Sequence, residues 1–171
     1  MNKIAFLFAL TLTVCTGCRS AGAAGPLDAL RKIKIERETI LMLGGNIPPV
    51  TDFCNWRGMT CTLKPGTFGG TAAMSLTRTK SGLIAQFQFD YGVMFSDAIQ
   101  AQIDDYTRML GKPSRDSISK SGSIDFRELT WSDSSTTFEL SYKYVTGREQ
   151  AEASATLSDN ALTEHHHESL D

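Results

Sequence analysis

The chain has 171 residues, of which 41% are hydrophobic and 21% charged, and its formal net charge is −2. This balance is that of one folded domain with a single core, and it excludes a wholly disordered chain. A mildly acidic chain is also a poor partner for nucleic acid.

Residues 1–23 predict an export signal. Lys3 provides a positive charge, and an apolar run over 4–14 is followed by small residues, a pattern typical of bacterial signals and too short to span a bilayer. Cleavage before Ala24 leaves 15 of the 17 basic residues and all 19 acidic residues, a formal net charge of −4. Since no second long apolar segment follows, we expect no transmembrane span in the mature form.

A second processing site competes with the first. Residues 15–18, Cys-Thr-Gly-Cys, resemble a bacterial lipoprotein box, which predicts a signal of residues 1–17 and lipidation of Cys18. The sequence therefore predicts an exported protein, either in the periplasm or anchored to a membrane as a lipoprotein.

Cys54 and Cys61 remain after either cleavage. An even pair of cysteines in an oxidising compartment predicts a disulfide. Trp56 and Arg57 lie between them, and both are residue types that are common in contact hot spots. One interpretation makes them a partner contact on a stapled loop, and the other folds Trp56 over the edge of the core.

The predicted elements begin with a helix over residues 26–43, because proline suits a first turn and apolar residues recur along a broken stripe. The cysteine loop, 52–63, then runs into a first strand. Alternating residues at 71–79 and 83–91, joined by Lys80-Ser81-Gly82, predict a hairpin. Residues 95–113 predict a central helix that ends at Gly111 and Pro113. Its apolar face is formed by Ile99, Ile103, Tyr106 and Leu110.

Beyond this helix, residues 114–123 are polar and predict a flexible loop. Strands are predicted at 124–131, 137–144 and 151–157, and residues 158–171 predict a polar, disordered tail. We therefore expect one α+β domain over 24–157. Its antiparallel sheet of five to six strands would pack against one central helix, with an additional N-terminal helix.

Several catalytic patterns can be rejected. Residues 117–120 fit the S-x-x-K motif of serine β-lactamases, but they lie in a predicted loop and the related motifs come in the wrong order. His165, His166 and His167 are the only histidines, and adjacent positions on a predicted tail make a weak metal site. Asp104 and Asp105 are neighbours on the predicted helix and point to different sides. We expect no enzyme activity and no cofactor.

The helix exit Met109-Leu110-Gly111-Lys112-Pro113, followed by Leu129-Thr130-Trp131 and an alternating strand, resembles small exported bacterial proteins. It is also distantly similar to the small outer-membrane assembly lipoproteins, over residues 96–157. The resemblance implies an envelope scaffold or binding module and assigns no functional residue.

Three functions follow as hypotheses. The first is a non-catalytic interaction module of the cell envelope, with an envelope protein as partner. The second is an inhibitor or immunity-type protein that blocks an envelope hydrolase through the loop between Cys54 and Cys61, because a preorganised loop binds at a lower entropic cost. The third, a small hydrolase using carboxylates, requires a concave site with perturbed acids.

Overall fold

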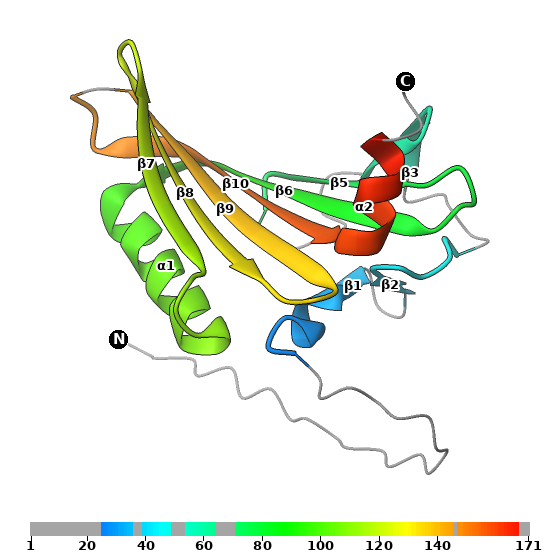
Figure 1. Ribbon diagram of the computed structural model, residues 1–171. Coiled ribbons are helices and arrows are strands. Elements are labelled where there is room, and N and C mark those ends of the chain that lie inside the picture. Colours follow the sequence, from blue (N-terminus) through cyan, green and yellow to red (C-terminus); the bar gives the residue numbers. More distant parts are fainter. Residues whose placement is uncertain (1–24, 36–38, 49–53, 64–70, 146, 168–171) are drawn as a thin grey trace, which may run out of the picture.

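The computed structural model describes residues 25–35, 39–48, 54–63, 71–145 and 147–167. The predicted signal, its cleavage sites and Cys18 lie outside the described residues. The described residues form two α-helices, one short 3-10 helix, an eight-stranded antiparallel sheet and a two-stranded sheet. The strand order in the large sheet is β3-β4-β5-β6-β10-β9-β8-β7 (Figure 1).

The elements have these bounds, in chain order: η1 (Asp28–Arg31), β1 (Lys32–Ile35), β2 (Thr39–Met42), β3 (Cys54–Arg57), β4 (Thr60–Leu63), β5 (Ala73–Arg78), β6 (Ile84–Phe95), α1 (Ser96–Leu110), β7 (Arg115–Ser121), β8 (Ile124–Ser132), β9 (Thr136–Val145), β10 (Gln150–Asp159) and α2 (Asn160–His167).

One face of the large sheet is apolar because cross-strand partners repeat the same residue types. Opposed positions on neighbouring strands share a face, so the register aligns whole rows of core residues. One row is Met74, Phe89, Ala155, Leu140 and Leu129. The next row is Leu76, Phe87, Leu157, Phe138 and Trp131. Between these core positions, polar residues such as Gln86 and Gln88 occupy the opposite face, as the alternation predicts.

The apolar face has two covers, which lie on the same side of the sheet (Figure 1). The first, here called the helix cover, is α1, which buries Ile99, Ile103 and Leu110 as its predicted face requires. The second, here called the hairpin cover, consists of η1, β1 and β2. It adds Ile33, Ile35 and Leu41 to the same hydrophobic core.

The predicted fold class is wrong. The sequence predicted five to six strands with an additional N-terminal helix, whereas the protein is mostly β-structure around an eight-stranded sheet. Residues 114–123, predicted as a loop, form β7 and the turn into β8, because the exposed polar strand pairs along its length with β8. The cysteine loop is a hairpin of two strands, β3 and β4.

The predicted N-terminal helix is also wrong. Residues 32–35 read Lys-Ile-Lys-Ile and alternate exposed and buried positions, which is the period of a strand. The stripe that predicted a helix combined residues that lie on opposite faces, since Ile33 is buried whereas Ile40 is 57% exposed. At the other end of the chain, β10 continues to Asp159 and α2 follows, where the sequence predicted a disordered tail.

Candidate functional site

A pocket of about 390 Å³ lies on the apolar face of the sheet, between the helix cover and the hairpin cover. Its lining comes from η1, β1, β6, α1, β9 and β10: Ala29, Leu30, Lys32, Ile33, Lys34, Phe89, Tyr91, Tyr106, Phe138 and Leu157. A volume in the range of about 300–1,000 Å³ with a mainly apolar lining is typical of small-molecule sites. Neither cover alone encloses this space, so the pocket depends on how both are held.

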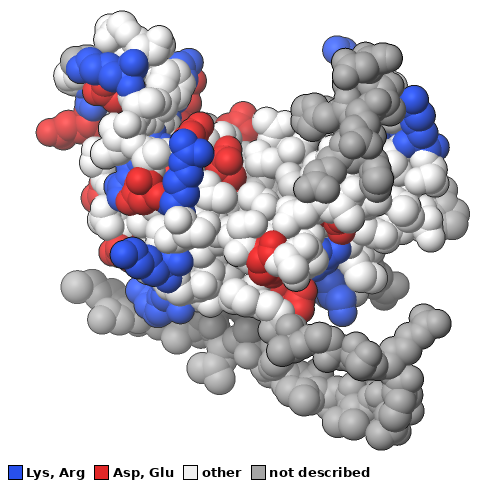
Figure 2. Space-filling view, in the orientation of Figure 1, with Lys and Arg blue, Asp and Glu red and all other residues white. Residues whose placement is uncertain are grey.

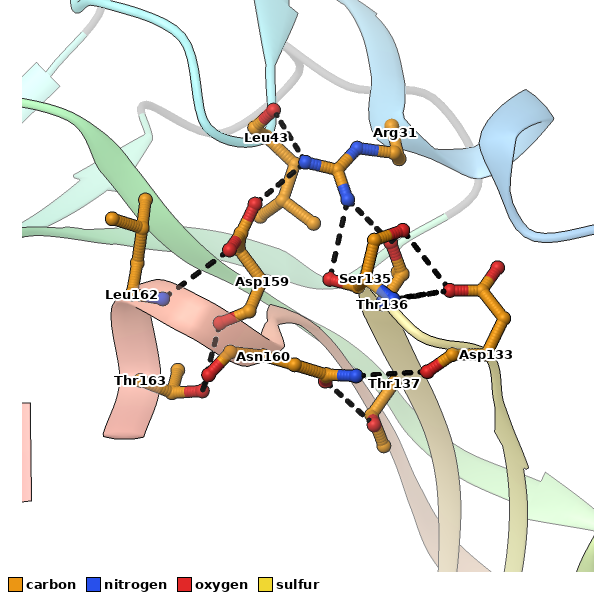
Figure 3. Close-up of polar contacts among 10 residues, drawn as sticks. All are labelled: Arg31, Leu43, Asp133, Ser135, Thr136, Thr137, Asp159, Asn160, Leu162 and Thr163. Atoms are coloured by element: carbon orange, nitrogen blue, oxygen red, sulfur yellow. Dashed lines mark hydrogen bonds and ion pairs between the residues drawn. The ribbon is translucent and has the colours of Figure 1, made fainter. Parts of the chain in front are cut away.

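Arg31 holds the hairpin cover against the end of the sheet (Figure 3). Its Nη2 atom donates to Asp159 Oδ2 at 2.6 Å and to the carbonyl of Leu43 at 3.3 Å. Its Nη1 atom donates to Thr136 Oγ1 and to the carbonyl of Ser135. The side chains of Arg31 and Asp159 are only 19% and 11% exposed, so this ion pair is shielded from water. Because Arg31 lies between Leu30 and Lys32, these contacts position one wall of the pocket.

The network continues through Asp133 (Figure 3). Its Oδ1 atom accepts hydrogen bonds from the Ser135 amide at 2.8 Å, the Ser135 hydroxyl at 3.0 Å and the Thr136 amide at 2.8 Å. Burial acts to raise the pKa of Asp133, but these hydrogen bonds and the charge of Arg31 outweigh it and lower the pKa below 3.8. The carboxylate therefore stays ionised and fixes the turn that presents Thr136 to Arg31.

Gly25 makes a close contact with the same carboxylate. A Cβ atom built on Gly25 would lie 2.5 Å from Asp133 Oδ2, which is closer than side-chain atoms approach. The chain entering η1 can pass the carboxylate only because residue 25 lacks a side chain. This close approach places the segment before η1 beside the turn at Asp133.

The helix cover is attached differently. Tyr142 donates from its hydroxyl to Gln102 Oε1 at 2.9 Å, and Trp131 donates from Nε1 to the carbonyl of Gly111 at 2.8 Å. Gly111 has a φ of 82°, a conformation that glycine adopts readily, and its carbonyl is thereby presented to the indole. Tyr106 packs on Phe138 with ring centroids 4.8 Å apart. Apolar packing and neutral hydrogen bonds thus hold α1.

The polar groups of the pocket are few. The hydroxyls of Tyr91 and Tyr106 lie 3.2 Å apart, so one donates to the other and the second proton remains for another acceptor. Burial, followed by the neighbouring Tyr106, raises the pKa of Tyr91 far above its ordinary value of 10.0. Tyr91 is therefore a neutral donor at physiological pH. The charged residues of the lining are Lys32 and Lys34, and the lining contains no carboxylate.

A second hollow, of about 340 Å³, lies at the corner formed by β7, β8 and β9. Two arginines line it, Arg127 and Arg148, and Arg127 binds Asp116 through Nε and Nη2, at 3.2 and 3.0 Å. The hydrogen bond from Arg127 is the largest influence on Asp116 and lowers the pKa of this carboxyl group. Because Arg127 is already paired and the apolar area of this hollow is small, it is a weaker candidate for a ligand site.

The sequence-predicted contact residues are placed away from the pocket. Cys54 and Cys61 lie at disulfide distance, as the sequence predicted, with their Cα atoms 5.5 Å apart across β3 and β4. Trp56 packs against the core and is covered by the guanidinium of Arg78, 4.4 Å from the ring centroid. Trp56 therefore lies partly buried at the edge of the core, while Arg57 is exposed at the end of β3, and a partner contact through either stays a prediction.

The other candidates form no site among the described side chains. His165, His166 and His167 occupy the end of α2, and among the described residues no group of three or more His, Cys, Asp or Glu side chains could hold a metal ion. Asp104 and Asp105 are exposed on α1, where they bind Gln100 and Arg108 of the same helix. Residues 117–120, which fit S-x-x-K, lie in the exposed edge strand β7.

Sequence reasoning missed every residue of the pocket as a site. Residues 26–43 predict a helix, and the alternating residues at 83–91 and 137–144 predict strands, so neither pattern indicates a ligand site. The one available signal was the alternation of lysine and isoleucine over residues 32–35, which predicts a strand with a basic face. Comparisons with protein-family models, curated proteins and solved structures find no match to this chain. The resemblance to envelope lipoproteins therefore stays a prediction.

Proposed function

We propose that the protein is a non-catalytic binding module of the bacterial cell envelope that holds an apolar ligand in the pocket between its two covers. The single observation that carries the proposal is the pocket itself, a concave, mainly apolar space bounded by separately attached elements. Its ionisable lining groups are two lysines and two tyrosines, which suit binding, and no acid-base pair or nucleophile with an activating base lies among them.

Two features of the chain support an envelope location. Residues 1–23 are typical of an export signal, and the Cys54–Cys61 pair agrees with folding in an oxidising compartment. Within the described part of the chain, no helix has the length and apolar character needed to cross a membrane. Periplasmic and lipid-anchored forms are both compatible with the proposal, because the pocket is built by the folded domain alone.

The charge distribution agrees with a small ligand better than with nucleic acid. On the face drawn in Figure 2, positive and negative side chains are interspersed and form no continuous basic surface. A nucleic-acid interface would need a basic patch or stripe to replace the counterions of the phosphates.

Titration with a neutral, environment-sensitive naphthylamine dye tests this proposal. The chain from Ala24 onward should bind the dye saturably and increase its fluorescence. Ala29 is exposed and lines the pocket, so Ala29→Trp should fill the space without disturbing the core and weaken dye binding about tenfold. Ala101→Trp, on the exposed side of α1 and outside the pocket, is the matched control and should leave binding unchanged.

Two results would contradict the proposal: no saturable binding to the folded chain, or the same effect from both tryptophan variants. In either case the pocket would be a packing defect between the two covers and would have no role in binding.

A further inference from the structure

We infer that the ligand of this pocket is a single-chain amphiphile with an anionic head, whose chain lies on the apolar floor and whose head pairs with Lys32 and Lys34. The inference rests on the proposed function and names the ligand class of the same site. It is carried by the size of the pocket, by the two lysines of β1, for which the described part of the chain offers no ion pair, and by the outer face of the hairpin cover.

The pocket has room for a short chain. At about 30 Å³ for each water-sized group, its 390 Å³ holds about a dozen non-hydrogen atoms. Phe89, Phe138 and Leu157 supply a floor of aromatic and aliphatic carbon, against which an alkyl chain loses its water contact. A linear acyl chain of about ten carbons matches this volume.

The charge of the lining is of one sign. Lys32 and Lys34 line the pocket from β1, and the lining contains no acid to neutralise them. Within the described residues neither lysine forms an ion pair. By contrast, Lys143 of β9 binds Glu152 of the adjacent strand β10 at 3.0 Å. Both lysines are exposed and alternate with the buried Ile33 and Ile35, so they lie at the solvent-facing rim of the pocket. An ammonium at the rim of an apolar pocket attracts an anionic group that is attached to an apolar chain.

The outer face of the hairpin cover also combines lysines with apolar side chains. Lys32 is opposite Met42 and Lys34 is opposite Ile40 in the β1–β2 register, so all four side chains share one face. Ile40 is 57% exposed and Met42 is 46% exposed, which is unusual for large apolar side chains. A face that alternates lysines with exposed apolar residues suits the head and first carbons of an anionic amphiphile.

The test compares decanoate with decanol, which have the same chain length and differ in head charge. Both are titrated against the dye-loaded chain from Ala24 onward, at low ionic strength and below their aggregation concentrations. Decanoate should displace the dye at least about tenfold more tightly than decanol. The double variant Lys32→Gln/Lys34→Gln, with displacement measured against its own dye affinity, should reduce this preference to within about twofold. Lys80→Gln, in the exposed turn before β6, is the matched control and should keep the full preference.

The outcomes separate this inference from the proposed function. If the two compounds displace the dye equally, or if the preference survives the double variant, the anionic head is excluded and apolar binding stands. If the dye itself does not bind, the proposed function is contradicted, and the inference about the ligand class falls with it. A third arm uses anionic phospholipid vesicles. If the double variant loses vesicle binding but keeps the preference for decanoate, the lysines serve a membrane surface and the inference is overturned.

Discussion

The two covers of the sheet share apolar packing but differ in their polar attachments. The helix cover buries three apolar residues of one continuous helix and adds neutral hydrogen bonds from Tyr142 and Trp131. The hairpin cover is small, with two strands of four residues each, and adds a shielded ion pair between Arg31 and Asp159 to its buried residues. A two-stranded hairpin of this size is at best marginally stable by itself.

This difference explains why a pocket forms between the covers. Close packing of the helix cover is favoured over its whole length, because every turn contributes apolar area. The hairpin cover is instead located by several contacts at the end of the sheet: Arg31 donates to Ser135, Thr136 and Asp159, and backbone hydrogen bonds join Gly44 and Gly45 to Ile84. These contacts and its buried apolar residues set its position, and the space left between the covers is the pocket.

The largest expected effect on the free energy of unfolding comes from a substitution that weakens the packing of the helix cover. Ile103 is buried, so Ile103→Ala should lower the free energy of unfolding by about 3 kcal/mol, from lost burial and the cavity that remains. Met109 is 54% exposed on the same helix, and Met109→Ala should cost less than about 1 kcal/mol. Urea unfolding measures both. Equal losses would show that α1 is not packed through the face described here.

Removing the ion pair that attaches the hairpin cover should have a smaller effect on global stability. Arg31→Met should cost about 2 kcal/mol, below the range for fully buried pairs because both partners keep some exposure. It should also reduce dye binding in the pocket, because the wall formed by Leu30 and Lys32 loses its anchor. Arg108→Met is the control: its ion pair with Asp105 is 76% and 67% exposed and should contribute about 0.5 kcal/mol or less.

Hydrogen exchange distinguishes the two breaks. In Arg31→Met the amides of β1 and β2 should exchange faster while those of α1 keep their protection. Faster exchange throughout the protein would mean that the hairpin cover is not a separately attached unit.

The smallest effect concerns Tyr91, which lies where both covers meet the pocket. Its folded-state pKa is raised above the ordinary 10.0, so its contribution to stability is fully present below pH 10 and is lost as the pH rises further. Tyr91→Phe loses the hydrogen bond to Tyr106, about 1 kcal/mol. The difference between the two proteins in unfolding free energy should therefore shrink between about pH 8 and about pH 11. A difference that stays constant over this range would show that Tyr91 titrates normally.

Part of the fold could be predicted from local patterns. The apolar face of α1 follows from a period of 3.6 residues, and the alternating strands of β6, β9 and β10 follow from a period of two. The Cys54–Cys61 pair follows from counting cysteines in an exported chain. The pocket could not be predicted, because its lining comes from six elements and its residues, taken one by one, read as ordinary core positions.

The sequence by itself determined which segments have a strong apolar period and which face of each must be buried. Only the tertiary structure decided that residues 32–35 and 39–42 form strands and that 115–121 joins the sheet, because these short or polar segments need a partner to form hydrogen bonds. It also decided where the hairpin cover lies. Arg31 and Asp159 are 128 residues apart in the chain, and no local pattern specifies a contact over that separation. That contact helps to hold one wall of the pocket.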